Sequence, residues 1–196
     1  FFIVGATIIS NSDLTIQNVG INPLRDGILS ILGLMGANIE ILNKREFNRE
    51  LIADIRIRSA RLKGIKIPEN LVPSAIDEFP IILVAAACAE GETILSGAAE
   101  LRVKESDRIQ AMADGLEKLG ISVVTKDDGM KVVGGKFNGG VISSYGDHRI
   151  AMAFAIAGAA SESKVIVEDC DSVKTSFPNF TDLFRDSGLN IDVELT

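Results

Sequence analysis

The hydrophobic positions along the chain predict two kinds of helix. Three stretches are rich in alanine and apolar on nearly every side: 1–9, 80–89 and 150–160. A helix without a polar face is stable in water only when other elements enclose it, so we expect these three in the interior. Three other stretches carry apolar residues on one helical face only: 25–35, 107–119 and 178–187. We expect these to lie on a sheet with one side in water.

Strand-like runs alternate with these helices. Each apolar stretch is followed by a β-type run: 14–19, 93–96 and 165–168. Each amphipathic stretch stops at a glycine, the residue that commonly follows a helix C-terminus: Gly36, Gly120 and Gly188. After each glycine comes an alternating strand: 37–42, 121–125 and 189–195. Further strands at 54–61 and 130–133 complete the two longer copies.

The repeated order predicts three copies of one supersecondary unit, at roughly 1–72, 73–143 and 144–196. No Pro/Ser-rich linker separates the copies. We therefore predict one α/β domain, 1–196, with pseudo-threefold internal symmetry. In the simplest packing the apolar helices lie inside, and the sheets with their amphipathic helices lie outside.

Composition narrows the class of protein. With 46% apolar residues, the 196-residue chain can bury a real core. Its net charge of −7 argues against nucleic-acid binding, and no apolar run is long enough to span a bilayer. Cys88 and Cys170 form no C-x-x-C pair that would indicate a zinc or redox site. The chain begins Phe1-Phe2 without an initiator Met, which we interpret as a cut through a helix in a longer protein.

Charged and capping residues gather just before the predicted helices. The stretch 101–108, Leu-Arg-Val-Lys-Glu-Ser-Asp-Arg, precedes an amphipathic helix. The stretch 146–149, Gly-Asp-His-Arg, precedes an apolar helix and contains the only histidine. Short polar side chains at helix starts are predicted N-caps: Asp77, Ser106 or Asp107, Asp147, and Ser176.

Helix N-termini carry about half a positive charge and unpaired N–H groups, so each is a potential anion site. If the helices run parallel, their starts meet, and four cations would surround one anion: Lys104, Arg108, Arg149 and Lys174. Simpler alternatives remain open. A capping aspartate is usually only a cap, a mixed-charge loop is usually solvated, and a lone histidine in a first turn is more often incidental than catalytic. The residues alone therefore indicate a phosphate or carboxylate site and nothing narrower.

Two of these motifs resemble a known family. The stretches 102–108 and 147–152 are closely similar to two signatures of the 5-enolpyruvylshikimate-3-phosphate synthases. The stretches 77–80 and 175–178 resemble the bacterial class often associated with glyphosate tolerance. The resemblance implies an inside-out α/β barrel domain, built of three repeated βαβαββ-type units with buried apolar helices. This chain would then be most of the C-terminal half of a two-domain enzyme.

The resemblance also implies an activity. The family transfers the enolpyruvyl group of phosphoenolpyruvate to the 5-hydroxyl of shikimate 3-phosphate, releases phosphate and serves chorismate and aromatic amino acid biosynthesis. It implies a cytoplasmic monomer without cofactor or metal, and no nucleic-acid or membrane partner. The missing N-terminal domain would complete the cleft. Two alternatives stay open: a UDP-N-acetylglucosamine enolpyruvyl transferase, and a non-catalytic anion-binding module.

The roles of individual residues are likewise implied by the resemblance. The catalytic acid–base residues would be Asp77 and Glu105. The phosphoenolpyruvate-binding residues would be Arg108, Arg149, His148 and Lys174. Shikimate 3-phosphate would contact Asp77 and Lys104. Lys174 departs from the best-known family pattern, because Ser176 places it one residue further upstream of Phe177-Pro178, and its role is therefore open.

Overall fold

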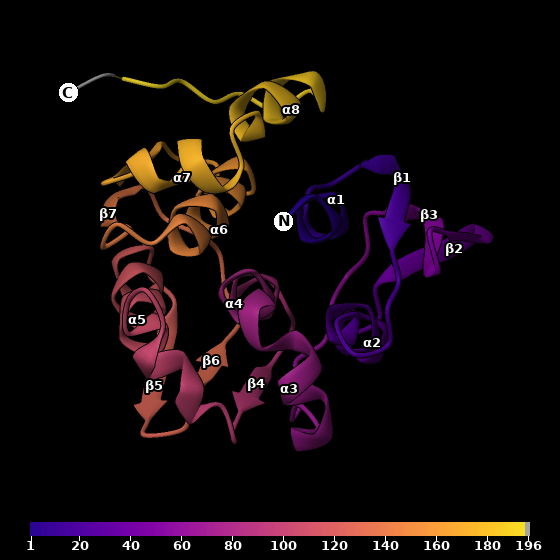
Figure 1. Ribbon diagram of the computed structural model, residues 1–196. Helices are drawn as coiled ribbons and strands as arrows, with labels where there is room; N and C mark the ends of the chain where they lie inside the picture. Colours follow the sequence, from indigo (N-terminus) through magenta and orange to yellow (C-terminus); the bar gives the residue numbers. More distant parts are fainter. Residues whose placement is uncertain (195–196) are drawn as a thin grey trace.

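The structure is a computed structural model and describes residues 1–194. Three apolar helices lie together at the centre, with three small sheets around them (Figure 1). These helices are α1 (Phe2–Ile8), α4 (Phe79–Ala87) and α6 (His148–Ala159), and each contacts the other two. Every residue of α4 is buried, as expected for a helix with no polar face. The predicted inside-out α/β arrangement is confirmed.

The first two sheets share one strand order, which is what a repeated unit requires. The first is β1 (Asp13–Gly20), β3 (Glu50–Arg58) and β2 (Asn38–Phe47); the second is β4 (Glu92–Leu95), β6 (Gly129–Val133) and β5 (Ser122–Lys126). All neighbours in both sheets are antiparallel. Within residues 1–194 the third sheet is the parallel pair β7 (Gly140–Ser143) and β8 (Val165–Glu168). The unit boundaries at 72/73 and 143/144 stay a prediction.

Parallel segments lead into two of the central helices. Strand β7 lies beside β8 and continues through a short turn into α6. The chain at Lys63 and Lys66 forms parallel bridges to Glu90 and Ile94 in the same way, beside β4. It continues through three short helices toward α4: η1 (Glu69–Leu71), α3 (Val72–Ala75) and η2 (Ile76–Glu78). The starts of α4 and α6 are thus reached by equivalent routes.

The three amphipathic helices are α2 (Gly27–Leu34), α5 (Arg108–Lys118) and α8 (Phe180–Asp186). Helix α2 packs on β2. Helix α5 packs on β5 with Ile109, Met112 and Leu116 buried, while Gln110 and Glu117 are exposed. The one-sided pattern in the sequence is therefore confirmed for α5. A short helix, η3 (Ala99–Val103), precedes it.

The third copy departs from the prediction in several places. Residues 189–194 form no strand; instead the Nε of Arg185 donates to the carbonyl of Ile191 (3.1 Å), which ties this segment back to α8. Leu195, the predicted end of that strand, lies outside the described residues. The predicted connector before α8 contains a helix, α7 (Asp171–Ser176). Ser176 therefore ends α7 and caps nothing, since the N-cap of α8 is Asn179.

One continuous helical stretch, Glu69–Ala87, is long and apolar enough by length and composition to cross a membrane. Within the protein, 61% of its most apolar window is buried. It packs against the other central helices, as the core helix of a globular protein does. The prediction that no apolar run is long enough to span a bilayer is therefore wrong by length and composition, although the core of the fold explains this stretch.

Candidate functional site

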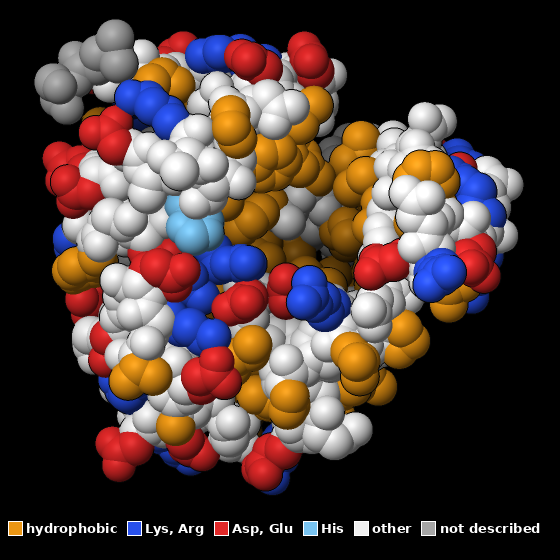
Figure 2. Space-filling view, in the orientation of Figure 1, with side chains coloured by type: hydrophobic (Ala, Val, Ile, Leu, Met, Phe, Trp, Pro, Cys, Tyr) orange, Lys and Arg blue, Asp and Glu red, His pale blue; other side chains and the backbone are white. Residues whose placement is uncertain are grey.

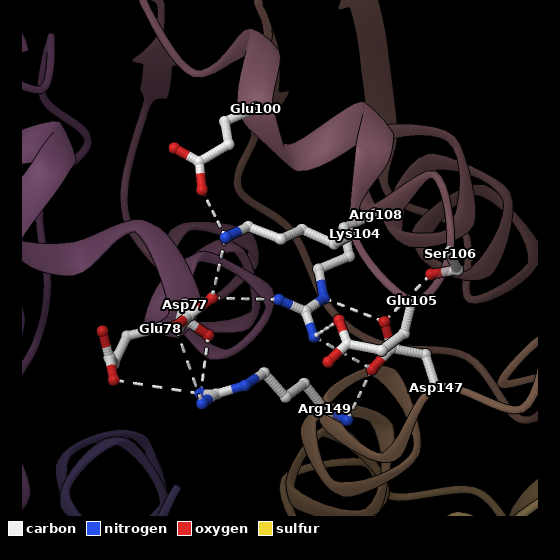
Figure 3. A network of polar contacts seen from close by, with 9 residues as sticks. All are labelled: Asp77, Glu78, Glu100, Lys104, Glu105, Ser106, Arg108, Asp147 and Arg149. Atoms are coloured by element: carbon white, nitrogen blue, oxygen red, sulfur yellow. Dashed lines mark hydrogen bonds and ion pairs between the residues drawn. The ribbon is translucent and has the colours of Figure 1, made fainter.

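The starts of α4, α5 and α6 meet on one face of the protein. Asp77 lies in η2 just before α4, Arg108 is the first residue of α5, and Arg149 is the second residue of α6. The Nη1 of Arg108 donates to Oδ1 of Asp77 (3.2 Å), and the Nη1 of Arg149 donates to the carbonyl of Asp77 (2.9 Å; Figure 3). Figure 2 shows charged side chains of both signs packed together beside an apolar hollow. The expected convergence of helix starts is confirmed for α4, α5 and α6.

The deepest part of this cluster is the pair Arg108–Asp147. The Nε of Arg108 lies 2.8 Å from Oδ2 of Asp147, and the two side chains are 1% and 0% exposed. Asp147 also accepts from the Oγ of Ser106 (3.0 Å) and from the backbone N–H of Arg149 (2.8 Å), so it is the predicted N-cap of α6. Burial alone would raise the pKa of Asp147, but these donors outweigh it and hold the pKa below its usual 3.8.

Asp77 has three cations around its carboxylate. They are Lys104 (Nζ–Oδ1, 3.4 Å), Arg108 (Nη1–Oδ1, 3.2 Å) and Arg149 (Nη2–Oδ2, 4.0 Å). Burial would raise the pKa of Asp77, but Arg149, Lys104 and Arg108 together lower it below 3.8. The predicted cap is wrong: α4 begins after Glu78, and no side chain caps it. The carboxylate of Asp77 instead forms ion pairs with these three cations.

Glu105 and Lys104 lie at the edge of the cluster. The Nη2 of Arg108 donates to Oε2 of Glu105 (2.6 Å), whose side chain is 54% exposed. Lys104 pairs with both Glu100 and Asp77, and these bonds raise its pKa. Both residues belong to the irregular turn between η3 and α5, which leaves them open to solvent on one side. A carboxylate and an ammonium group at such an edge can meet a ligand without unfolding the core.

The remaining predicted residues differ in position. His148 is the first residue of α6 and is half-buried between Asp147 and Arg149. It is the pale blue side chain beside the charged groups in Figure 2. Lys174 is not brought into the cluster. Its side chain is 62% exposed, and its ion pair is with Asp171 (2.8 Å), one turn earlier in α7. The expectation that four cations share one site is therefore corrected to three.

Among the further carboxylates of the cluster, Asp147 and Glu78 lie against its arginines but were not identified from the sequence as members. Asp147 was predicted only as a cap, although it also binds the guanidinium of Arg108, 39 residues away in the chain. Glu78 is half-buried 3.8 Å from Nη1 of Arg149, and burial raises its pKa despite that neighbour. The only available sequence signal was position at a helix start. Among residues 1–194, no group of three or more His, Cys, Asp or Glu side chains is arranged to hold a metal ion.

Comparison with known proteins gives a consistent result. The family model described as EPSP synthase (3-phosphoshikimate 1-carboxyvinyltransferase) matches residues 1–184. A protein of that name from Alkalilimnicola ehrlichii is 56% identical over 190 residues, covering 96% of this chain and 43% of the relative. The one from Methylococcus capsulatus is 57% identical over 193 residues, covering 98% of this chain and 44% of the relative.

Solved structures agree with the sequence relatives. An EPSP synthase from Acinetobacter baumannii superposes with a TM-score of 0.96 at 50% identity, over 99% of this chain and 46% of that one. The enolpyruvyl transferase NikO from Streptomyces tendae, 17% identical with a TM-score of 0.78, shares the fold. The chain spans less than half the length of these relatives. On the family match and on identities above one half, the chain belongs to the EPSP synthase family.

Proposed function

We propose that the chain supplies one domain of an enzyme that transfers the enolpyruvyl group of phosphoenolpyruvate to the 5-hydroxyl of shikimate 3-phosphate and releases phosphate. The observation that carries this proposal is the meeting of Asp77, Glu105, Arg108 and Arg149 at three helix starts. Membership of the EPSP synthase family supports it independently. The relatives' greater length supports a cleft completed by a second domain.

The reaction needs two proton transfers in its addition step and one in its elimination step. In the addition step, the 5-hydroxyl loses a proton as its oxygen bonds to C2 of phosphoenolpyruvate, and the methylene carbon gains a proton. In the elimination step, the methyl group loses a proton, phosphate leaves C2 and the double bond returns. We assign the hydroxyl proton to Asp77, since three cations keep its carboxylate ionised at neutral pH. We assign the methylene proton to Glu105. Each such group typically contributes about 10²–10⁴-fold.

Three cations would hold the negative charges of the substrates. Arg108 and Arg149 present planar guanidinium groups, which suit phosphate and carboxylate oxygens, and Lys104 would meet shikimate 3-phosphate. In the protein all three already face carboxylates. Because Arg108 is only 1% exposed, an anion reaches it only if Glu105 or Asp77 gives up its ion pair. Binding would then exchange one anion for another in a site prepared in advance.

The assignments of His148 and Lys174 are supported by fewer contacts than those of the residues above. His148 borders the same face and would contact phosphoenolpyruvate. Lys174 would do so only if α7 moves or its pair with Asp171 opens. We also propose that the complete enzyme acts as a cytoplasmic monomer without metal or cofactor, and without a nucleic-acid or membrane partner.

The test uses a full-length protein that contains this chain, assayed for phosphate release. We expect release with phosphoenolpyruvate and shikimate 3-phosphate, and a large loss of kcat in Asp77→Asn and Glu105→Gln. Glu117→Gln, on the exposed face of α5, is the matched control and should leave kcat unchanged. Release with UDP-N-acetylglucosamine but not with shikimate 3-phosphate would overturn the proposal. So would binding of phosphoenolpyruvate without turnover of either acceptor, the behaviour of a non-catalytic module.

A further inference from the structure

Arg102 joins the turn that carries Lys104 and Glu105 to a neighbouring hairpin. It lies in η3, and its side chain is 28% exposed. Its Nε donates to the carbonyl of Asp127 (2.9 Å), and its Nη2 donates to the carbonyl of Lys126. Lys126 is the last residue of β5, and Asp127 lies in the turn between β5 and β6. The guanidinium thus binds a hairpin about 25 residues further along the chain. The 104–106 turn itself belongs to no helix or strand, so these bonds hold it in place.

The remaining nitrogen of the same guanidinium, Nη1, faces the start of α5. Its Nη1 donates to Oδ2 of Asp107 (2.8 Å), while Oδ1 of Asp107 accepts from the backbone N–H of Gln110 (3.0 Å) and caps α5. One arginine therefore connects the hairpin turn with the helix that begins at Arg108. Planar guanidinium groups are suited to such a role, because their donors are fixed in direction.

The other end of the segment is fixed on the same hairpin. Asp128 accepts from the backbone N–H of Gly97 through its carboxylate (2.9 Å) and from that of Ala98 through its carbonyl (2.7 Å). Arg102 and Asp128 together hold 97–107 against the hairpin. Glu105, half-exposed and bonded only through Arg108 in the described structure, depends on this support for its position.

We propose that Arg102 is a positioning residue that aims Glu105 and Lys104 at the substrates. The inference rests on the proposed function and adds a residue to it. Arg108 and Arg149 do not need Arg102, because the guanidinium of Arg108 is held by Asp147 and that of Arg149 donates to the carbonyl of Asp77. Loss of Arg102 should therefore affect the proton transfer at Glu105 much more than the binding of phosphoenolpyruvate.

The experiment measures kcat and the KM for phosphoenolpyruvate in the full-length protein with Arg102→Ala and Arg102→Lys. We expect kcat of Arg102→Ala to fall about ten- to hundredfold, the effect of misplacing a catalytic group by about 1 Å, with a much smaller change in KM. Arg102→Lys keeps a single donor nitrogen, so its kcat should be higher than that of Arg102→Ala. Millimolar guanidinium should also restore part of the kcat of Arg102→Ala, because the side chain is partly open to solvent.

Arg56→Ala is the control, since Arg56 is also a partly exposed arginine bonded through two nitrogens, to Asp13 on the first sheet. It should leave kcat unchanged. A kcat of Arg102→Ala close to wild type, or a fall in melting temperature alone, would overturn the inference. If Arg102→Ala does not fold, Arg102→Lys decides the question. An unchanged kcat in Arg102→Lys overturns the inference. A lowered kcat in Arg102→Lys at an unchanged melting temperature supports the inference. A wild-type protein with no turnover overturns the proposed function itself, which is a separate result.

Discussion

Arg108 and Asp147 form an ion pair that is almost completely withdrawn from water. The Nε–Oδ2 distance is 2.8 Å, and the side chains are 1% and 0% exposed. The pair joins the start of α5 to the start of α6, across 39 residues of sequence. A buried charge is tolerated only with its partner and its hydrogen bonds in place. The pair therefore fixes the two helix starts relative to each other before any ligand arrives.

The first prediction concerns this buried pair. Asp147→Ala leaves the guanidinium of Arg108 buried without its main partner, and it removes the N-cap of α6. Breaking a buried pair on one side typically costs about 3–5 kcal/mol, so we expect a loss of this size in the free energy of unfolding. Urea denaturation followed by circular dichroism measures it. Asp13→Ala removes the partner of an exposed arginine and should change stability little; equal losses in the two variants would contradict the argument.

The second prediction separates the two arginines proposed to bind phosphoenolpyruvate. Arg149 is 27% exposed, so Arg149→Ala should raise the KM for phosphoenolpyruvate by about ten- to hundredfold, the value of one charged hydrogen bond, with little effect on folding. The sequence alone predicts the same result for Arg108→Ala, which is a raised KM for phosphoenolpyruvate with little effect on folding. Its 1% exposure changes that expectation, because Arg108→Ala must also lower the melting temperature. Steady-state kinetics beside thermal denaturation distinguishes the two, and an unchanged KM in Arg149→Ala would contradict the assignment.

The third prediction is a pH dependence of stability on the first sheet. Asp54 accepts from the backbone N–H of Asn18 and from the side chains of Asn43 and Arg45, which lowers its pKa from 3.8 to about 2. Below 3.8 the unfolded chain takes up a proton that the folded protein resists, so stability contributed by Asp54 is lost as the pH falls toward 2.

Melting temperatures measured between neutral pH and this acid range test the effect. Asp54→Asn should be less stable than wild type at neutral pH, and the difference between the two should shrink as the pH falls through the window. Asp192→Asn, an exposed carboxylate outside any helix or strand, is the control. A constant difference between Asp54→Asn and wild type at every pH would show that the charge of Asp54 is not what stabilises the sheet.

The fourth prediction concerns the packing of α5 against α6. A Cβ added at Gly115 would lie 2.2 Å from the ring of Phe154. Gly115→Ala should therefore destabilise the protein by about 1–3 kcal/mol through overpacking, more than the roughly 1 kcal/mol gained in helix propensity. Gly33→Ala in α2, where nothing lies within 4 Å of the added Cβ, should not destabilise it. Adding Phe154→Leu to Gly115→Ala should recover part of the loss in thermal denaturation, whereas simple additivity would contradict the contact.

The fifth prediction concerns the chain by itself. Its relatives are more than twice as long, and positioning by the rest of the cleft supplies a large part of the barrier reduction. We therefore expect negligible phosphate release from this chain alone and restored release when it is joined to the remaining segment of a relative such as that of Methylococcus capsulatus. Measurable turnover by the chain alone would contradict this.

The sequence determined the inner helices, most strands and the helix starts that carry the candidate site. Apolar residues on all sides of 80–89 had to be buried, and helical spacing of apolar residues in 107–119 required a covered face and a wet face. These features are local, because a period of 3.6 or 2 residues is written directly into the chain. The placement of Asp77, Glu105 and Arg149 at helix starts was local in the same sense.

Only the tertiary structure decided which of those side chains meet. Asp147 binds Arg108, and Arg102 grips the β5–β6 turn, through contacts that no periodicity encodes. Lys174 has the right charge and lies near the expected motif, yet α7 pairs it with Asp171. Residues 189–194 have an alternating pattern but form no strand in the described structure. Ion pairs and strand pairing depend on distances between remote segments, and those distances exist only once the core has packed.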